Sequence, residues 1–176
     1  VRAIANMPLI CFPAGLQGRP DLLIRIDDKQ SRFGNYAYEV YEIKSTKKIK
    51  AAHRLQAAAY NRILGQVQGW EPPQFFLVGK DMEPIPMAMT DVARILDEKL
   101  EQMRSIAEGK CVPPPCYKDA KDRWKSYVKD LAVQASEPSL INSVGCRTRD
   151  DLVAAGFRTV SDVAAANEDV LAGIKG

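Results

Sequence analysis

Two stretches, Asp21–Asp27 (DLLIRID) and Tyr36–Lys44 (YAYEVYEIK), decide how the first half of this chain folds. Apolar and polar residues alternate in the first stretch, and the second is rich in aromatic and β-branched side chains, so both are predicted to be strands. The polar segment Asp28–Asn35 between them contains Gly34 and is predicted to be a hairpin loop. We therefore expect the two strands to pair as neighbours in one sheet.

The segments around this hairpin complete an α/β pattern. After the second strand the apolar spacing becomes helical, which predicts a helix over Lys47–Leu64 that ends at Gly65. Before the hairpin, Met7–Phe12 is a short apolar run that Pro13 stops. After the helix, strands are expected at Gln74–Val78 and Ile85–Met89, and a helix from a cap at Asp91 to Ala107, before Gly109. This order predicts a mixed sheet flanked by helices.

A proline-rich stretch, Val112–Cys116, marks a change of character along the chain. After it, Asp119–Gln134 is predicted to be helical, and several short helical pieces separated by glycines follow. We predict a sheet-containing core over residues 1–116, a helical connector over residues 117–138, and a small all-α module over residues 139–176.

The composition of the 176 residues, 46% hydrophobic and 27% charged, is close to the average of globular proteins. Apolar runs such as Phe75–Gly79 are too short to span a bilayer, and no secretory signal opens the chain, so we expect a cytoplasmic protein without a membrane partner. Residues 1–60 hold ten Lys and Arg against five Asp and Glu, whereas the rest of the chain has no cationic excess. A polyanionic partner is therefore expected to approach the first 60 residues.

The four cysteines are not expected to form disulfides, because reducing compartments keep thiols free. Their expected role is that of buried or idle thiols.

Polar residues at the strand ends form the candidate site. Because strand side chains alternate, Glu42 and Lys44 are predicted to lie on one face and Ile43 on the other. A hairpin between the two strands can bring Asp21 beside Glu42. The carboxylates of Asp21 and Glu42 and the backbone carbonyl of Ile43 are hard ligands that suit Mg²⁺ or Mn²⁺. Lys44 would orient a water molecule or offset charge on a phosphate. Taken alone, the spacing is also typical of an ordinary solvated strand face.

Three motifs occur in a fixed order, namely Gly18–Leu23 (GRPDLL), Glu42–Ser45 (EIKS) and Gln56–Tyr60 (QAAAY). Over about residues 8–110 they resemble the RecB-like branch of the PD-(D/E)XK nucleases. The resemblance implies a restriction-endonuclease-like fold and a metal-dependent deoxyribonuclease, with single strands or ends of DNA as the expected substrate.

The resemblance also implies a role for each motif residue. Asp21 and Glu42 would bind the metal, Lys44 would be catalytic, and Gln56 and Tyr60 would support the site from one helix face, since they stand four residues apart.

Three further residues, Lys48, His53 and Arg54, are predicted to lie on the same helix as Gln56 and to contact DNA phosphates. The alternative for the lysines at positions 47, 48 and 50 is a solvated helix face.

The tail from Ser139 resembles a helix-hairpin-helix module, with Val144-Gly145 and Ile174-Lys175-Gly176 as the hairpin glycines. Such turns present backbone N–H groups to a phosphate, but the charge of the tail is balanced, so DNA binding and a structural or protein-contacting role both stay open.

Two features of the family are incomplete in this chain. Some relatives hold an iron–sulfur cluster, for which Cys11, Cys111 and Cys116 are candidates, but the closing cysteines are missing and no cluster is expected. Relatives also carry an acidic residue or a histidine on helices before the first motif, where only six residues precede Met7 here. We therefore expect a piece of a longer protein with further domains. Two alternatives to an active nuclease are an inactive nuclease fold that binds nucleic acid and a protein-interaction domain of the same fold.

Overall fold

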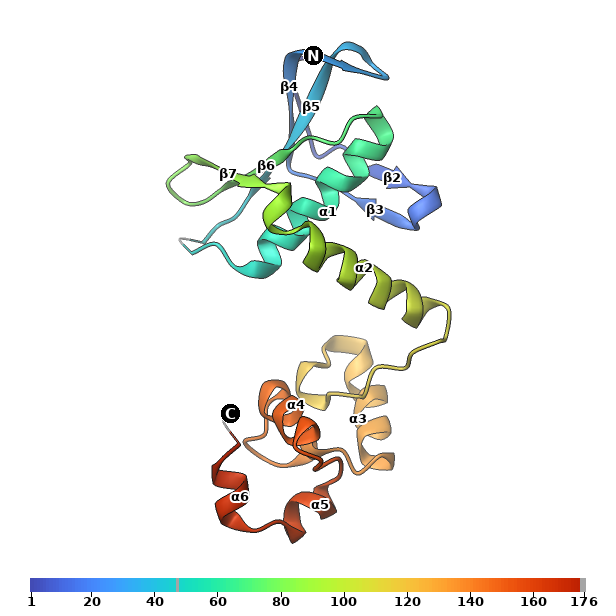
Figure 1. The fold of residues 1–176 in the computed structure, drawn as a ribbon, viewed down its shortest axis with the longest axis vertical. Coiled ribbons are helices and arrows are strands. Elements are labelled where there is room, and N and C mark those ends of the chain that lie inside the picture. The colour runs from blue at the N-terminus through green and yellow to red at the C-terminus, as the bar shows by residue number, and fades with distance from the viewer. Residues whose placement is uncertain (47, 175–176) are drawn as a thin grey trace. The chain divides into compact units, whose positions relative to one another are not determined.

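The structure is a computed structural model that describes residues 1–46 and 48–174. It forms two compact units, Val1–Lys110 and Cys111–Gly176 (Figure 1). The segment 117–138, predicted to be a connector, lies in the second of these units. Within the described ranges, none of the helices combines the length and the apolar character needed to cross a membrane.

A five-stranded mixed sheet forms the centre of the first unit (Figure 1). In sheet order its strands are β1 (Ala3–Ala5), β4 (Leu22–Ser31), β5 (Gly34–Ile43), β6 (Gln74–Val78) and β7 (Pro84–Ala88). The helix α1 (Ala51–Gln68) connects the parallel pair β5 and β6, and the other neighbouring strands of this sheet are antiparallel. A separate hairpin pairs β2 (Leu9–Cys11) with β3 (Leu16–Gly18). The prediction of an α/β fold with a mixed sheet and flanking helices is thus confirmed.

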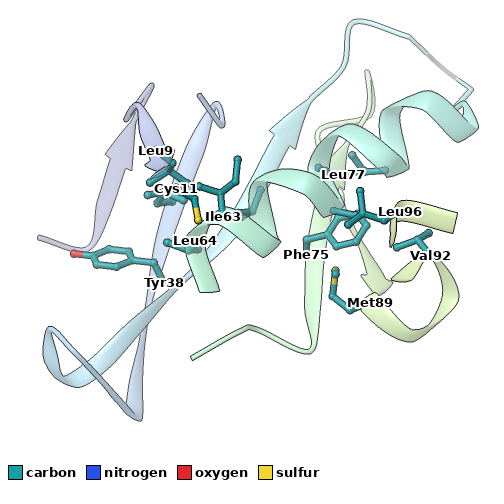
Figure 2. Packing of buried hydrophobic residues seen from close by; sticks show 14 residues of the cluster. Leu9, Cys11, Tyr38, Ile63, Leu64, Phe75, Leu77, Met89, Val92 and Leu96 are labelled. Atoms are coloured by element: carbon teal, nitrogen blue, oxygen red, sulfur yellow. The ribbon is translucent and has the colours of Figure 1, made fainter. Parts of the chain in front are cut away.

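One face of this sheet packs against α1 and the start of α2 (Ala93–Ala107). Alternate strand positions supply the contacts, as the period of two requires, and Leu23, Val40 and Leu77 are almost completely buried there. Figure 2 shows the core side chains Leu9, Cys11, Tyr38, Ile63, Leu64, Phe75, Leu77, Met89, Val92 and Leu96. This cluster comes entirely from the first unit, which therefore has a hydrophobic core of its own.

The prediction of a hairpin loop over Asp28–Asn35 is wrong. β4 continues to Ser31 and β5 begins at Gly34, so that residues 32–33 form a tight turn. The pairing of β4 with β5 shifts in register between Asp27 and Ser31, where Asp28 has a φ of 62°. Such an irregularity allows the strand to continue through these polar residues. Their side chains are exposed on both faces, and for this reason no hydrophobic alternation marks them as a strand.

The bounds of α1 also differ from the prediction. Lys47 lies outside the described residues, and residues 48–50 precede the helix, which begins at Ala51. Gly65 does not end the helix but lies within it. A glycine is needed at this position because a Cβ atom would come within 2.8 Å of the Glu71 backbone. The helix ends instead at Gly69, whose φ of 74° is left-handed.

The start of α2 differs as well. Asp91 belongs to the 3₁₀ turn η2 (Met89–Asp91), and α2 begins at Ala93 after the cap residue Val92.

The second unit consists of short helices. Its α-helices are α3 (Lys125–Gln134), α4 (Cys146–Ala154), α5 (Val160–Ala165) and α6 (Glu168–Ala172), and its 3₁₀ turns are η3 (Tyr117–Asp119), η4 (Asp122–Trp124) and η5 (Pro138–Leu140). The predicted helix over Asp119–Gln134 is therefore two 3₁₀ turns followed by a shorter α-helix. Gly145 is the N-cap of α4, whereas Lys175 and Gly176 lie outside the described residues.

The expectation of four free thiols is wrong for two of them. Cys116 and Cys146 form a disulfide, and their Cα atoms are 6.1 Å apart, a normal spacing for such a bond. They are 30 residues apart in the sequence, so that only the packing of the second unit brings them together. Cys11 and Cys111 are free thiols, the first buried and the second exposed.

Candidate functional site

The register of the β4–β5 hairpin places the two predicted carboxylates side by side. Leu22 pairs with Tyr41, so that Asp21, one residue before β4, lies opposite Glu42 in β5. The backbone N–H of Ile43 donates a hydrogen bond to Asp21 Oδ2 at 2.7 Å, and that of Asp21 donates to Glu42 Oε2 at 3.3 Å. These two bonds hold both carboxylates at the end of the hairpin.

Lys44 extends this arrangement toward α1. Its Nζ lies 2.8 Å from Glu42 Oε1 and 2.8 Å from Gln56 Oε1. Glu42 is only 3% exposed, and a buried carboxylate needs a charged or hydrogen-bonding partner. The ammonium group of Lys44 is that partner.

The helix α1 supplies the other end of the same chain of contacts. Gln56 Nε2 donates to Tyr60 OH at 2.9 Å, as expected for two residues four apart on one helix face. The ring of Tyr60 lies directly against Gly18 in β3, where a Cβ atom would overlap Cδ1 and Cε1 of the ring. The glycine of the first motif is therefore required by close approach rather than by an unusual backbone angle.

The structure thus joins Asp21, Glu42, Lys44, Gln56 and Tyr60 in one continuous series of hydrogen bonds. These residues come from three segments of the chain, namely the start of β4, the end of β5 and α1.

The three residues predicted to contact phosphates lie near the start of α1, but not all of them on it. Lys48 precedes the helix in a loop, where its backbone N–H donates to Thr46 Oγ1, so its predicted position on the helix is wrong. His53 accepts a hydrogen bond from the Lys50 N–H at 3.3 Å and thereby caps the helix. Arg54 is exposed on the first turn of α1.

Arg19 is a further cation that the sequence analysis did not select. It is exposed and stands two residues before Asp21, within the first motif. Its position two residues before Asp21 is the sequence signal that would have selected it as a candidate phosphate contact.

The opposite face of β5 carries a different environment. Tyr41 stacks on Phe76 with ring centroids 4.3 Å apart. Burial, together with the negative charge of Glu39, raises the pKa of Tyr41 above its ordinary value. Glu39 lies on that face as well and accepts a hydrogen bond from Gln74, so it is not part of the candidate site.

The donor set suits a hard divalent cation. Two carboxylates and one ammonium group leave a local formal charge of −1, which a cation would offset. Asp21 and Glu42, with the backbone carbonyl of Ile43, are the oxygen donors that Mg²⁺ or Mn²⁺ prefers.

Neither the comparison with protein-family profiles nor the comparison with curated proteins finds a match for this chain.

Proposed function

We propose that the first unit is a metal-dependent deoxyribonuclease of the RecB-like PD-(D/E)XK type, with a restriction-endonuclease-like sheet. The observation that carries this proposal is the hydrogen-bonded series from Asp21 through Glu42, Lys44 and Gln56 to Tyr60. A solvated strand face would not need a helix glutamine and tyrosine aligned behind its lysine.

Asp21 and Glu42, with the carbonyl of Ile43, would hold the ion in this proposal. When bound, the ion supplies an activated water molecule and offsets phosphate charge. The backbone N–H of Ile43 fixes the orientation of the Asp21 carboxylate before any ligand arrives. This preorganisation avoids reorganising the carboxylate during the reaction.

Lys44 would stabilise the negative charge that develops on the phosphate in the transition state. The amide oxygen of Gln56 accepts a hydrogen bond from the Lys44 ammonium group, and the amide nitrogen donates to Tyr60 OH. Tyr60 thereby fixes the orientation of the amide. Lys48, His53 and Arg54 would contact the phosphates of a DNA strand or end that approaches the site. The tail has balanced charge and is not assigned to DNA binding in this proposal.

Three variants separate metal binding from chemistry. Asp21→Asn and Glu42→Gln should each weaken Mn²⁺ binding and abolish cleavage together, because both remove a charged ligand. Lys44→Ala should keep the metal, bound slightly tighter, since a positive charge 2.8 Å from a ligand is lost. Its cleavage rate should fall by roughly two to three orders of magnitude. Calorimetry and cleavage of labelled single and double strands, with Mn²⁺ and with a chelator, measure both properties.

The matched controls are Asp28→Asn and Lys29→Ala, which change exposed residues of the same strand β4. Both should bind metal and cleave as the parent does, and circular dichroism verifies the folding of all five variants. Cleavage by Lys44→Ala at the parental rate, or unchanged metal binding by Asp21→Asn, contradicts the proposal. DNA binding without metal-dependent cleavage in the parent would instead indicate an inactive fold that binds nucleic acid.

A further inference from the structure

A second group of metal-ligating side chains lies in the unit Cys111–Gly176. The sulfur atoms of Cys116 and Cys146 and a carboxylate oxygen of Asp119 all lie within 4.8 Å of one another. Cys116 immediately precedes η3, Asp119 ends it, and Cys146 is the first residue of α4. The cysteines are half-buried and the aspartate is exposed, so that reagents from solvent reach the group.

We propose that, when the disulfide is reduced, Cys116, Cys146 and Asp119 bind Zn²⁺, and that oxidation to the disulfide releases the ion. Two thiolates and one carboxylate provide three of the four ligands of a tetrahedral zinc site, and a water molecule completes the set. Thiolates select zinc over magnesium or calcium because they are soft ligands. The proposal does not depend on the nuclease activity of the first unit.

The positions of these ligands do not depend on the disulfide alone. Within η3, the Asp119 N–H donates to the Cys116 carbonyl, which turns the aspartate back toward the cysteine. The Tyr117 N–H donates to Ser139 Oγ at 3.1 Å, and Ser139 in turn donates to Glu137.

Glu137 completes the connection to α4. Its Oε1 lies 3.1 Å from Nε of the buried Arg149, an ion pair whose angles are not those of a hydrogen bond. A polar network therefore connects the turn that carries Cys116 and Asp119 to the helix that carries Cys146. After reduction, this network keeps the three ligands close.

The helix also favours the reduced, metal-bound state of Cys146. This residue begins a nine-residue helix, where the peptide dipoles stabilise a negative thiolate. Two thiolates and a carboxylate carry a formal charge of −3, which a divalent cation largely offsets.

The redox step balances with common reagents. A small thiol (RSH) reduces the bond as Cys116–S–S–Cys146 plus two RSH gives two cysteine thiols plus RSSR. Zinc then displaces one proton from each thiol. In the reverse direction, hydrogen peroxide accepts two electrons from the bound thiolates and, with two protons, becomes two water molecules, while the S–S bond forms and Zn²⁺ leaves.

Either cross-link would join η3 to α4, the disulfide under oxidising conditions and the zinc ion under reducing ones. The reduced, metal-free form is then the least stable of the three, because it has neither cross-link.

The test uses the full chain in oxidised form and after reduction by a water-soluble phosphine that is then removed. We expect one equivalent of Zn²⁺ to bind the reduced chain and none to bind the oxidised chain at this site, by calorimetry and by competition with a chromophoric chelator. Co²⁺ in place of zinc should give a thiolate charge-transfer band. Hydrogen peroxide should release the zinc while two thiols are lost.

Variants identify the ligands. Cys116→Ser should abolish binding, and Asp119→Asn, which keeps the disulfide and hence the fold, should weaken it at least tenfold. Cys111→Ser and Asp122→Asn change an exposed thiol and an exposed carboxylate nearby and should bind zinc as the parent does. Equal zinc binding by Asp119→Asn and the parent, or no zinc binding by the reduced chain, overturns the proposal. So does iron–sulfur absorbance of the anaerobically purified chain that is lost in Cys116→Ala.

Discussion

At the scale of single residues, Gly18 matters because the ring of Tyr60 occupies the space where a side chain would begin. Gly18→Ala should therefore displace Tyr60 and break its hydrogen bond with Gln56. If the proposed function holds, the cleavage rate should fall roughly tenfold, the scale of one lost hydrogen bond. A cleavage assay at saturating Mn²⁺ measures this effect.

Two further variants show whether the displaced ring is the cause. Tyr60→Phe keeps the ring but removes the hydroxyl group, so it should lower the rate by a similar factor. Gly145→Ala, at a glycine with no neighbouring atom within 4 Å, should leave cleavage unchanged. Parental cleavage by Gly18→Ala, with the fold intact, would show that the Gln56–Tyr60 contact has no role in the chemistry.

Arg149 is expected to stabilise the second unit, because it is the charged partner of the buried Glu137. Arg149→Leu leaves this carboxylate without a compensating charge, and the free energy of unfolding should fall by about 3–5 kcal/mol. Urea denaturation of the oxidised chain measures the loss. Arg147→Leu, at an exposed position of the same helix, should change stability little, and equal effects of the two variants would contradict this account.

At the scale of elements, the side chain of Gln68 joins the end of α1 to β5. β6 pairs only with Tyr41–Ile43, so that the earlier part of β5 has an open edge. Gln68 occupies this edge as a strand would, because it accepts from the Tyr38 N–H at 2.9 Å and donates to the Tyr38 carbonyl at 3.0 Å. Gln68→Leu leaves both buried backbone groups without a partner and should cost roughly 2–4 kcal/mol, measured by urea denaturation.

The matched control for this variant is Gln66→Leu, two residues earlier in the same helix. The side chain of Gln66 is exposed, so the free energy of unfolding should stay within about 0.5 kcal/mol of the parent. A similar loss of unfolding free energy in both variants would mean that leucine itself destabilises the end of the helix. The hydrogen bonds to Tyr38 would then not be the cause.

At the scale of the whole molecule, the first unit holds its own core and all the proposed nuclease residues. A chain ending at Lys110 should therefore fold, bind DNA and cleave it as the full chain does. Lys48→Ala combined with Arg54→Ala should weaken DNA affinity and reduce the salt dependence by about one unit of slope for each lost phosphate contact. Fluorescence anisotropy over a series of salt concentrations measures both quantities.

The control for the double variant is Lys29→Ala combined with Lys99→Ala, which removes the same charge from exposed positions of β4 and α2. Its affinity should fall less, since only the general electrostatic attraction is reduced. If the chain ending at Lys110 loses DNA affinity while the Lys48 and Arg54 variant keeps it, the second unit forms the binding face.

The sequence by itself determined those features that depend on local periodicity. Strand alternation is a property of consecutive residues, so the placement of Glu42 and Lys44 on one face follows from their spacing alone. The same holds for Gln56 and Tyr60, because residues four apart share a helix face. The α/β class followed from the order of such segments, each recognisable without its neighbours.

Only the tertiary structure decided the features that arise from contacts between distant residues. The pairing of Leu22 with Tyr41 sets Asp21 opposite Glu42, and no local pattern specifies that register. Gly65 has the pattern of a helix stop, but it is a glycine because the Glu71 backbone approaches it closely. The polar residues after Asp27 form a strand although they show no apolar alternation. The disulfide joins cysteines 30 residues apart. Burial of apolar surface brings such distant segments together, and no pattern of consecutive residues reports which segments will meet.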